Sequence, residues 1–146
     1  MTIWHHTSLA VSNVDEAGGF FSAAFGFETI LDERDVTQTI SRMTGLPGLS
    51  CNLVQLRSPK FDQVLELIEF RHAEKTFPTI DDQPVGVGAA HICFHVDDLY
   101  VTLLRIEALG AKKVGEITEF DEGLSVYCWV PGGAYIEVEQ MHMEKV

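Results

Sequence analysis

Apolar and polar residues follow two kinds of spacing in the first part of the chain. In residues 3–11, IWHHTSLAV, they alternate, which is typical of a half-buried β-strand. From Val14 to Phe25 the apolar residues recur at helical spacing. The Ser12-Asn13 pair precedes this run and can cap the first turn of a helix. The pattern therefore predicts a strand followed by a helix.

The same pattern returns in the second half of the chain. Residues 89–96, AAHICFHV, alternate, and apolar residues recur at helical spacing over residues 99–109. The Asp97-Asp98 pair stands where it can cap this second helix. His6 and His91 occupy corresponding places, since each lies five residues before a valine. A supersecondary unit that occurs twice indicates two copies that pack together to complete one core.

Further strands follow each predicted helix, so that each half has the order β-α-β-β-β. They are predicted over residues 27–33, 51–57 and 63–70 in the first half, and over residues 111–117, 124–130 and 134–140 in the second. Residues 35–50 add a short helix and a loop to the first half. We expect one domain over residues 1–146, with module one at about 1–72, a linker at about 73–87 and module two at about 88–142.

Composition narrows the classes of partner. The net charge of -12 argues against binding to a nucleic-acid backbone, which requires clustered Lys and Arg. No apolar run approaches the ~20 residues of a membrane span, and no signal pattern opens the chain. The three cysteines, Cys51, Cys93 and Cys128, form no CxxC pair, which favours a reducing compartment. We therefore expect a cytoplasmic protein that binds a small molecule rather than nucleic acid or membrane.

Four polar residues lie in predicted strands at positions related by the repeat. Glu66 interrupts the apolar run of residues 64–68, where an unpaired carboxylate would be costly to bury. His6 and His91 lie in the first strand of each half, whereas Glu66 and Glu137 lie in the last. Two imidazoles and two carboxylates suit a divalent first-row metal that keeps open positions for substrate or water. The sequence therefore predicts a metal site formed by this quartet.

The paired βαβββ halves, with His in each first strand and Glu in each last strand, resemble the vicinal oxygen chelate superfamily. That superfamily includes glyoxalase I, methylmalonyl-CoA epimerase, extradiol dioxygenases and the bleomycin and fosfomycin resistance proteins. The resemblance covers nearly the whole chain and is strongest in HTSLAV, LELIEF, GAAHICFHVDDL and PGGAYIEVE. One departure is Val130, which replaces the aspartate that usually opens the Asp-Pro-x-Gly turn.

The resemblance implies an α+β fold in which the two modules form a curved, partly closed mixed sheet around a metal-binding cavity. It also implies a homodimer and one divalent metal ion per site (Ni, Co, Zn, Mn or Fe), bound by His6, Glu66, His91 and Glu137. The implied function is that of a lyase or isomerase acting alpha to a carbonyl through enolate or enediolate chemistry. Glu137 or Glu66 would serve as both ligand and base. Candidate pocket residues are Gln55, Tyr127, Trp129 and His95.

Two other functions stay open at this point. An iron-dependent extradiol dioxygenase would need only His6, His91 and Glu137, and Tyr127 fits its signature. Residues 118–120, where that signature has an acid/base histidine, are Thr-Glu-Phe instead. A non-catalytic antibiotic-binding resistance protein is the second alternative, although such members generally lack the metal quartet.

Three residues near the quartet receive lesser roles. His95 shares a face with His91 but has no counterpart in the repeat, so we expect a hydrogen-bonded pocket residue near Glu139. Cys93 is expected to fill space as a small apolar residue. His5 points to the face opposite His6 in an extended strand, which predicts packing or surface exposure.

Overall fold

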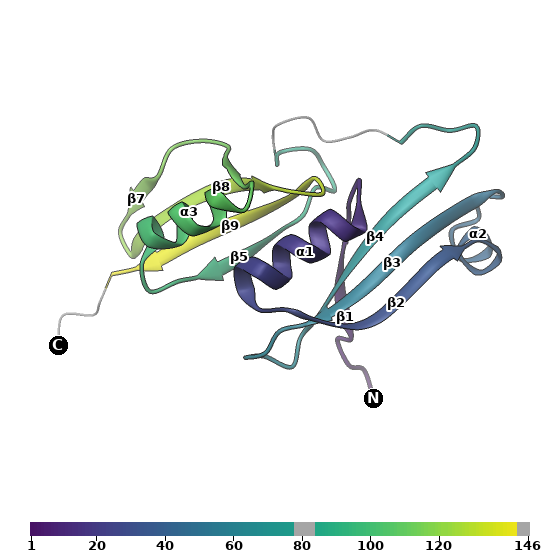
Figure 1. Ribbon diagram of the computed structural model, residues 1–146, viewed down its shortest axis with the longest axis horizontal. Helices are drawn as coiled ribbons and strands as arrows, with labels where there is room; N and C mark the ends of the chain where they lie inside the picture. Colours follow the sequence, from purple (N-terminus) through teal and green to yellow (C-terminus); the bar gives the residue numbers. More distant parts are fainter. Residues whose placement is uncertain (78–83, 143–146) are drawn as a thin grey trace. The chain divides into compact units, whose positions relative to one another are not determined.

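The structure is a computed structural model that describes residues 1–77 and 84–142 and contains two compact units, Met1–Thr79 and Ile80–Val146 (Figure 1). We call these units module 1 and module 2 and describe each by itself. Module 1 contains β1 (His6–Ala10), α1 (Val14–Phe25), β2 (Glu28–Val36), α2 (Gln38–Thr44), β3 (Leu49–Arg57) and β4 (Val64–His72). Module 2 contains β5 (His91–His95), α3 (Leu99–Ala108), β6 (Lys112–Lys113), β7 (Thr118–Phe120), β8 (Gly123–Val130) and β9 (Ala134–Met141). Residues 78–83 of the predicted linker lie outside the described residues.

Each module forms its own mixed sheet. The four strands of module 1 run in the order β1-β4-β3-β2, and those of module 2 in the order β5-β9-β8-β6, with β7 also paired to β8. In both modules the first strand pairs in parallel with the last, whereas the remaining neighbours are antiparallel. The predicted α+β class and the repeated βαβββ order are therefore confirmed, with the strands divided between two sheets.

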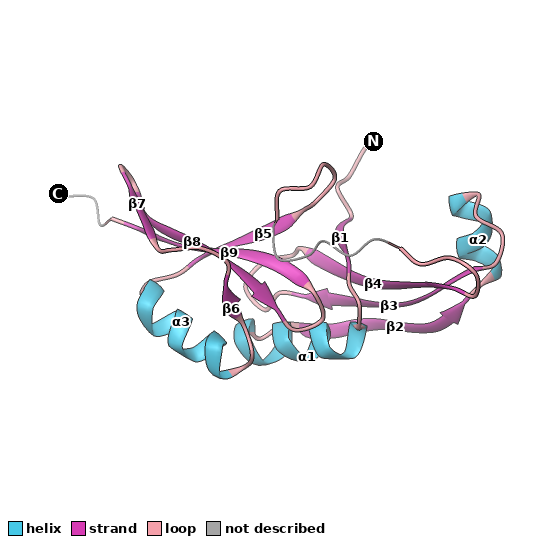
Figure 2. Cartoon of the chain, turned by 90° about the horizontal axis from the view of Figure 1, so that it is seen from above, coloured by secondary structure: helices cyan, strands magenta, loops and turns pink. Residues whose placement is uncertain are grey.

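In module 1, successive strand residues point to opposite faces of the sheet. Helix α1 covers one of these faces. Leu65 and Leu67 of β4 are buried, and α1 contacts β3 and β4 on this side (Figure 2). Phe21 of α1 is fully buried and its ring lies 5.9 Å from that of Phe27. The opposite face of β4 carries Glu66. The face covered by α1 is thus the main core, whereas the other face carries Glu66 and a smaller apolar cluster that includes Ile40 of α2 and Ile68.

Module 2 follows the same rule. Ile136 and Val138 of β9 are fully buried, as is Ile106 of α3, and α3 contacts β9. Glu137 and Glu139 alternate with these residues and so lie on the other face of β9. Both modules therefore present the predicted ligand glutamates, Glu66 and Glu137, on the sheet face that faces away from the helix.

The helix starts match the predicted capping pattern. Asn13 accepts hydrogen bonds from the backbone N–H groups of Asp15 and Glu16, both at 2.9 Å, as the sequence predicts. At α3 the cap is Asp98, which accepts from the backbone N–H of Val101 at 2.9 Å. Of the predicted capping pair Asp97-Asp98, Asp98 is therefore the residue that caps the helix, which begins at Leu99.

The strand predicted over residues 111–117 was also wrong in extent. Only Lys112 and Lys113 pair with β8, and a second short strand forms at Thr118–Phe120. Both segments lie at the margin of the sheet and pair only with β8. Within the described residues, no strand on their other side extends the pairing. Gly115 lies between them and favours the interruption. The short helix expected within residues 35–50 is present as α2.

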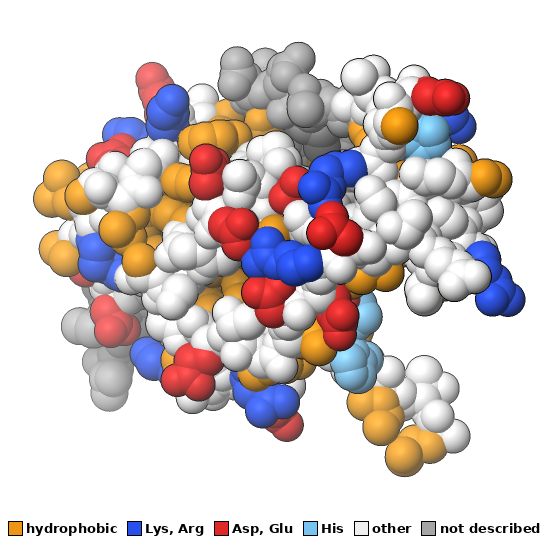
Figure 3. Space-filling model, turned by 45° about the vertical axis from the view of Figure 1, so that its right-hand side comes forward, with side chains coloured by type: hydrophobic (Ala, Val, Ile, Leu, Met, Phe, Trp, Pro, Cys, Tyr) orange, Lys and Arg blue, Asp and Glu red, His pale blue; other side chains and the backbone are white. Residues whose placement is uncertain are grey.

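Charged residues concentrate on the edge strand β2 and its neighbours. Arg34 hydrogen-bonds to Asp32 in the same strand and to Asp15 of α1, the latter at 2.8 Å from Nη2. Arg71 of β4 contacts Asp35 at 2.9 Å. Acidic and basic side chains are intermixed on the face shown in Figure 3. Such charges discourage the pairing of an exposed edge with another chain.

None of the three helices in the described part of the chain has the length and apolar composition that crossing a membrane requires.

Candidate metal centre

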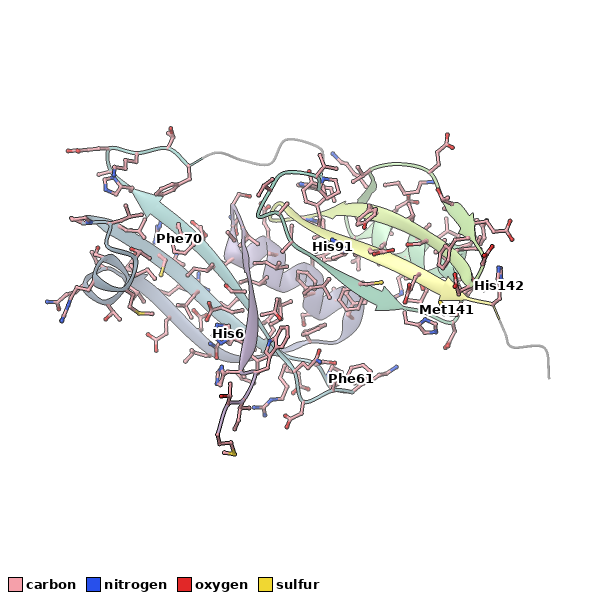
Figure 4. All side chains as sticks on the ribbon, turned by 180° about the vertical axis from the view of Figure 1, so that it is seen from behind. His6, Phe61, Phe70, His91, Met141 and His142 are labelled. Carbon is pink, nitrogen blue, oxygen red and sulfur yellow. The ribbon has the colours of Figure 1, made fainter. Side chains whose placement is uncertain are left out.

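In module 1, His6 and Glu66 lie next to each other on one face of the sheet. The parallel register pairs Ser8 with Glu66, so His6 is one same-face position away along β1. His6 Nε2 lies 3.7 Å from Glu66 Oε1, and the two side chains are 35% and 13% exposed. Figure 4 labels His6 on β1. The predicted ligands of this module are therefore brought together by the strand pairing itself.

Two neutral side chains hold the Glu66 carboxylate. Ser8 Oγ donates to Oε1 at 3.0 Å, and Gln55 Nε2 donates to Oε2 at 2.9 Å. Gln55 reaches Glu66 because β3 pairs these two residues directly. Both carboxylate oxygens are thus engaged, and the side chain is fixed from two neighbouring strands.

Module 2 repeats this arrangement with His91 and Glu137. The parallel register pairs Cys93 with Glu137, which corresponds to the pairing of Ser8 with Glu66. His91 Nε2 lies 3.3 Å from Glu137 Oε2, and the side chains are 34% and 21% exposed. Figure 4 labels His91 on β5. The two His–Glu pairs are therefore equivalent by register as well as by sequence.

Glu137 has different neighbours from Glu66. Ser125 Oγ donates to its Oε1 at 2.5 Å, and the Cys93 thiol hydrogen-bonds to both Glu137 and Glu139. Partial desolvation of the thiol by its neighbours and the negative charges of Glu137 and Glu139 raise the pKa of Cys93 to about 12. The prediction that Cys93 is an apolar filler was wrong, because the residue is exposed and lies between two carboxylates.

The candidate pocket residues occupy positions beside these pairs. Tyr127 pairs directly with Glu137 across β8 and β9, and its ring meets His91 edge-on with centroids 4.9 Å apart. Burial, followed by the charges of Glu137 and Cys93, raises the pKa of Tyr127. Trp129 lies one same-face position along β8, where Lys112 Nζ is 5.4 Å from its ring. Tyr127 in module 2 thus corresponds to Gln55 in module 1.

His95 has the neighbour that the sequence predicts. Its Nδ1 lies 3.8 Å from Glu139 Oε1, and its side chain is 57% exposed. One ligand atom from each of Cys93, Glu137 and Glu139 lies within 4.8 Å of the others. Module 2 therefore has a second group of metal-compatible atoms next to the His91–Glu137 pair.

The donor atoms in each module fit a divalent metal. Ligands bound to one ion at about 2.0–2.2 Å lie roughly 3.0–3.5 Å from each other, and the two Nε2–Oε distances are 3.7 and 3.3 Å. Neutral imidazole and carboxylate are both ligands for Zn, Mn, Fe, Co and Ni. Each His–Glu pair can thus contribute two ligands to an ion with only small side-chain movements.

Sequence reasoning did not identify three neighbours of these pairs. Ser8 and Ser125 were not expected to donate to the glutamates, although Ser8 shares a strand face with His6. His5 is exposed, as expected, but its contact with His6 was not predicted: the two Nδ1 atoms lie 2.8 Å apart. The repeat could have revealed Ser8, since it lies two residues after His6, where the parallel partner strand places Glu66.

Comparison with protein families gives a match over nearly the whole chain. The profile described as Glyoxalase/Bleomycin resistance protein/Dioxygenase superfamily matches residues 5–141. A search of curated protein sequences gave no match.

Comparison with solved structures gives full-length similarity of fold. A glyoxalase family protein from Bacillus cereus has a TM-score of 0.77 at 22% identity, with 98% of this chain and 96% of that chain covered. An antibiotic binding protein from Streptomyces has a TM-score of 0.60 at 17% identity, covering 97% and 99%. A mutant of the Listeria monocytogenes fosfomycin resistance protein FosX, complexed with Mn(II) and 1S,2S-dihydroxypropylphosphonic acid, has a TM-score of 0.59 at 16% identity, covering 99% and 94%. At these identities the similarity establishes the fold.

Proposed function

Because this chain belongs to the glyoxalase/bleomycin resistance protein/dioxygenase superfamily, we propose that it is a divalent-metal-dependent lyase or isomerase. Its reaction would take place alpha to a carbonyl of a small substrate, and its assembly would be a homodimer. The observation that carries the proposal is the duplicated His–Glu pair, at 3.7 Å in module 1 and 3.3 Å in module 2. A single such pair is a common surface contact, whereas two at equivalent register positions indicate a shared role.

The proposed ligands are His6, Glu66, His91 and Glu137, all contributed to one ion. A bound divalent ion would act as a Lewis acid that stabilises negative charge developing on substrate oxygens. The metal seen with FosX is Mn(II), which supports a divalent ion of this kind without fixing its identity here. The residues' own part is to orient the substrate and to move its proton.

We assign the proton transfer to Glu137 and a fixed ligand role to Glu66. Glu66 accepts from an amide and a hydroxyl, one on each oxygen, and its side chain is less exposed than that of Glu137. Glu137 accepts from the Ser125 hydroxyl and from the Cys93 thiol, which is a weak donor. Both glutamates accept from a serine hydroxyl, so the difference lies in the second donor, and the thiol restrains Glu137 less than the amide restrains Glu66. Glu137 is therefore the better general base.

Neighbouring aromatic side chains would orient the substrate. Tyr127 lies beside both Glu137 and His91 and retains its phenolic proton because its pKa is raised. Its hydroxyl can donate to a substrate oxygen near the base. Trp129 on the same face offers an apolar surface beside it. These contacts suit a small molecule with a polar, carbonyl-bearing end and an apolar remainder.

The test is solvent-deuterium exchange alpha to a carbonyl, measured by NMR on a panel of hemithioacetals and 2-methylacyl thioesters with Ni, Co, Zn or Mn. We expect exchange in the wild type. Glu137→Gln should lower it by about 100-fold or more, the typical contribution of a general base, while retaining metal. Glu66→Gln should lose metal first. Absence of exchange with every metal, or iron-dependent cleavage of catechol, would contradict the proposal and favour a dioxygenase.

Antibiotic binding is a second candidate, supported by the full-length similarity of fold to the Streptomyces antibiotic binding protein. In that case the chain would bind a ligand tightly without metal or turnover. Isothermal titration of metal-free protein with antibiotic panels distinguishes the two. Tight binding that is unchanged in His91→Ala would favour sequestration over catalysis.

A further inference from the structure

The ring of His5 contacts the ring nitrogen of His6 that faces away from Glu66. His5 Nδ1 and His6 Nδ1 lie 2.8 Å apart, with ring centroids 5.1 Å apart and planes at 86°. The other nitrogen of His6, Nε2, faces Glu66 Oε1 at 3.7 Å. The two nitrogens of His6 thus have separate tasks, and His5 occupies the one not directed at the proposed metal.

A hydrogen bond between two Nδ1 atoms of neutral imidazoles contains one proton, and its position determines the tautomer of each ring. If His6 Nδ1 donates, His6 Nε2 has a free lone pair. If His5 Nδ1 donates instead, the proton of neutral His6 must lie on Nε2, where it faces the Glu66 carboxylate and blocks coordination. The direction of this single hydrogen bond therefore decides whether His6 can bind a metal.

The local backbone keeps His5 in this position. Trp4 Nε1 donates to the His6 carbonyl oxygen at 3.2 Å, which closes the segment just before β1. Because β1 begins at His6, His5 precedes the strand and need not follow its alternation of faces. Figure 3 shows histidine side chains at the molecular surface.

Module 2 uses a different neighbour. The residue before His91 is Ala90, which has no ring nitrogen, and His91 instead meets the edge of Tyr127. The His–His contact is therefore specific to module 1, although the His–Glu pairs are equivalent.

We propose that His5 is a positioning residue that accepts the Nδ1 proton of His6 and so leaves His6 Nε2 unprotonated toward the metal. This inference rests on the proposed function for its purpose, since the metal would use the freed lone pair. Partners of this kind orient metal-bound histidines and set their tautomer, and their loss typically lowers metal affinity by about 10- to 100-fold.

Two variants of His5 distinguish the effect of its hydrogen-bond acceptor from the effect of its ring. His5→Phe keeps a planar ring without an acceptor, whereas His5→Asn places an amide oxygen near the position of Nδ1. We expect His5→Phe to weaken Zn(II) binding by about 10- to 100-fold and His5→Asn to restore most of it. His142→Phe, a histidine in contact with Glu119 rather than with the quartet, is the matched control and should bind as the wild type does. Competition with a chromophoric chelator measures these affinities.

The tautomer itself is read by long-range ¹H–¹⁵N NMR of histidine-labelled protein, with His6 assigned from His6→Ala. We expect an Nδ1–H tautomer of His6 in the wild type and a shift toward Nε2–H in His5→Phe. An unchanged tautomer and unchanged Zn(II) affinity in His5→Phe would overturn the inference while leaving the metal site intact. If the wild type binds no metal, the proposed function fails, and the tautomer in metal-free protein still decides whether His5 sets it.

Discussion

Modules 1 and 2 share a strand order and a His–Glu pair. They differ in the row of residues that lies next to Glu66 and Glu137 on the same face of each sheet. That row is Ala10, Leu53 and Ile68 in module 1, and His95, Ser125 and Glu139 in module 2. In module 1, Ile40 of α2 packs with the buried part of this face, including Ile68. In the described part of module 2, α3 is followed only by strands, and the row remains polar.

The difference indicates that the duplicated scaffold has taken separate tasks. Strand register alone is enough to place a His beside a Glu, so both modules retain the pair. The surroundings then decide its behaviour, since a hydroxyl and an amide hold Glu66, whereas a hydroxyl, a thiol and a second carboxylate surround Glu137. We therefore interpret module 1 as the anchoring half and module 2 as the reactive half of the proposed centre.

The largest effect should come from removing the core of one module. Phe21→Ala deletes a fully buried ring and should lower the free energy of unfolding by about 3–5 kcal/mol. Urea unfolding can be followed through Trp129 of module 2 in a Trp4→Phe background. Because we expect a single domain, the Trp129 transition should shift although the substitution lies in module 1. An unmoved transition would indicate that the modules unfold independently.

A smaller effect should separate the roles of the two glutamates. Gln55→Leu leaves Glu66 Oε2 without its amide donor and should lower metal affinity by about 10- to 100-fold. Ser125→Ala removes the hydroxyl donor to Glu137 and should mainly slow proton exchange, because that carboxylate is the proposed base. Chelator competition and deuterium exchange on both variants measure this. Slower proton exchange in Gln55→Leu and weaker metal binding in Ser125→Ala would contradict the roles assigned to the two modules.

The smallest effect concerns the reactivity of Cys93 in protein stripped of metal. Because its pKa is raised to about 12, Cys93 stays a neutral thiol at pH 8. It forms thiolate only when the pH rises far above 8. Alkylation by iodoacetamide at pH 8 should be at least about tenfold slower than that of a free cysteine. Glu139→Gln removes one of the negative charges and should speed it. Fast alkylation in the wild type would show that the carboxylates do not hold the proton on Cys93.

The sequence predicted the parts of the molecule that depend on regular spacing. Alternation and helical periodicity gave both modules, and the repeat placed His6, Glu66, His91 and Glu137 at equivalent positions, because register follows from strand order. The break between β6 and β7 was missed, since a strand at the sheet margin is limited by its lack of further neighbours rather than by its own residues.

Contacts that depend on side-chain direction were also missed. His5 precedes β1, so strand alternation did not predict the contact of its ring with His6. Cys93 was interpreted from its residue type alone, whereas its behaviour comes from two glutamates on the neighbouring strand. Such effects require the pairing partner of each residue, which local pattern does not provide.

The central claim is that the two His–Glu pairs bind one metal ion together, and metal content tests it most directly. Purified wild type, His6→Ala, His91→Ala and the control His142→Ala would be loaded, dialysed and measured by plasma mass spectrometry. We predict one divalent ion per chain in the wild type and the control, and loss of nearly all metal in each of the other two variants, although they alter different modules. Two ions per chain, with one retained in each variant, would contradict the claim, as would a metal content that neither substitution changes.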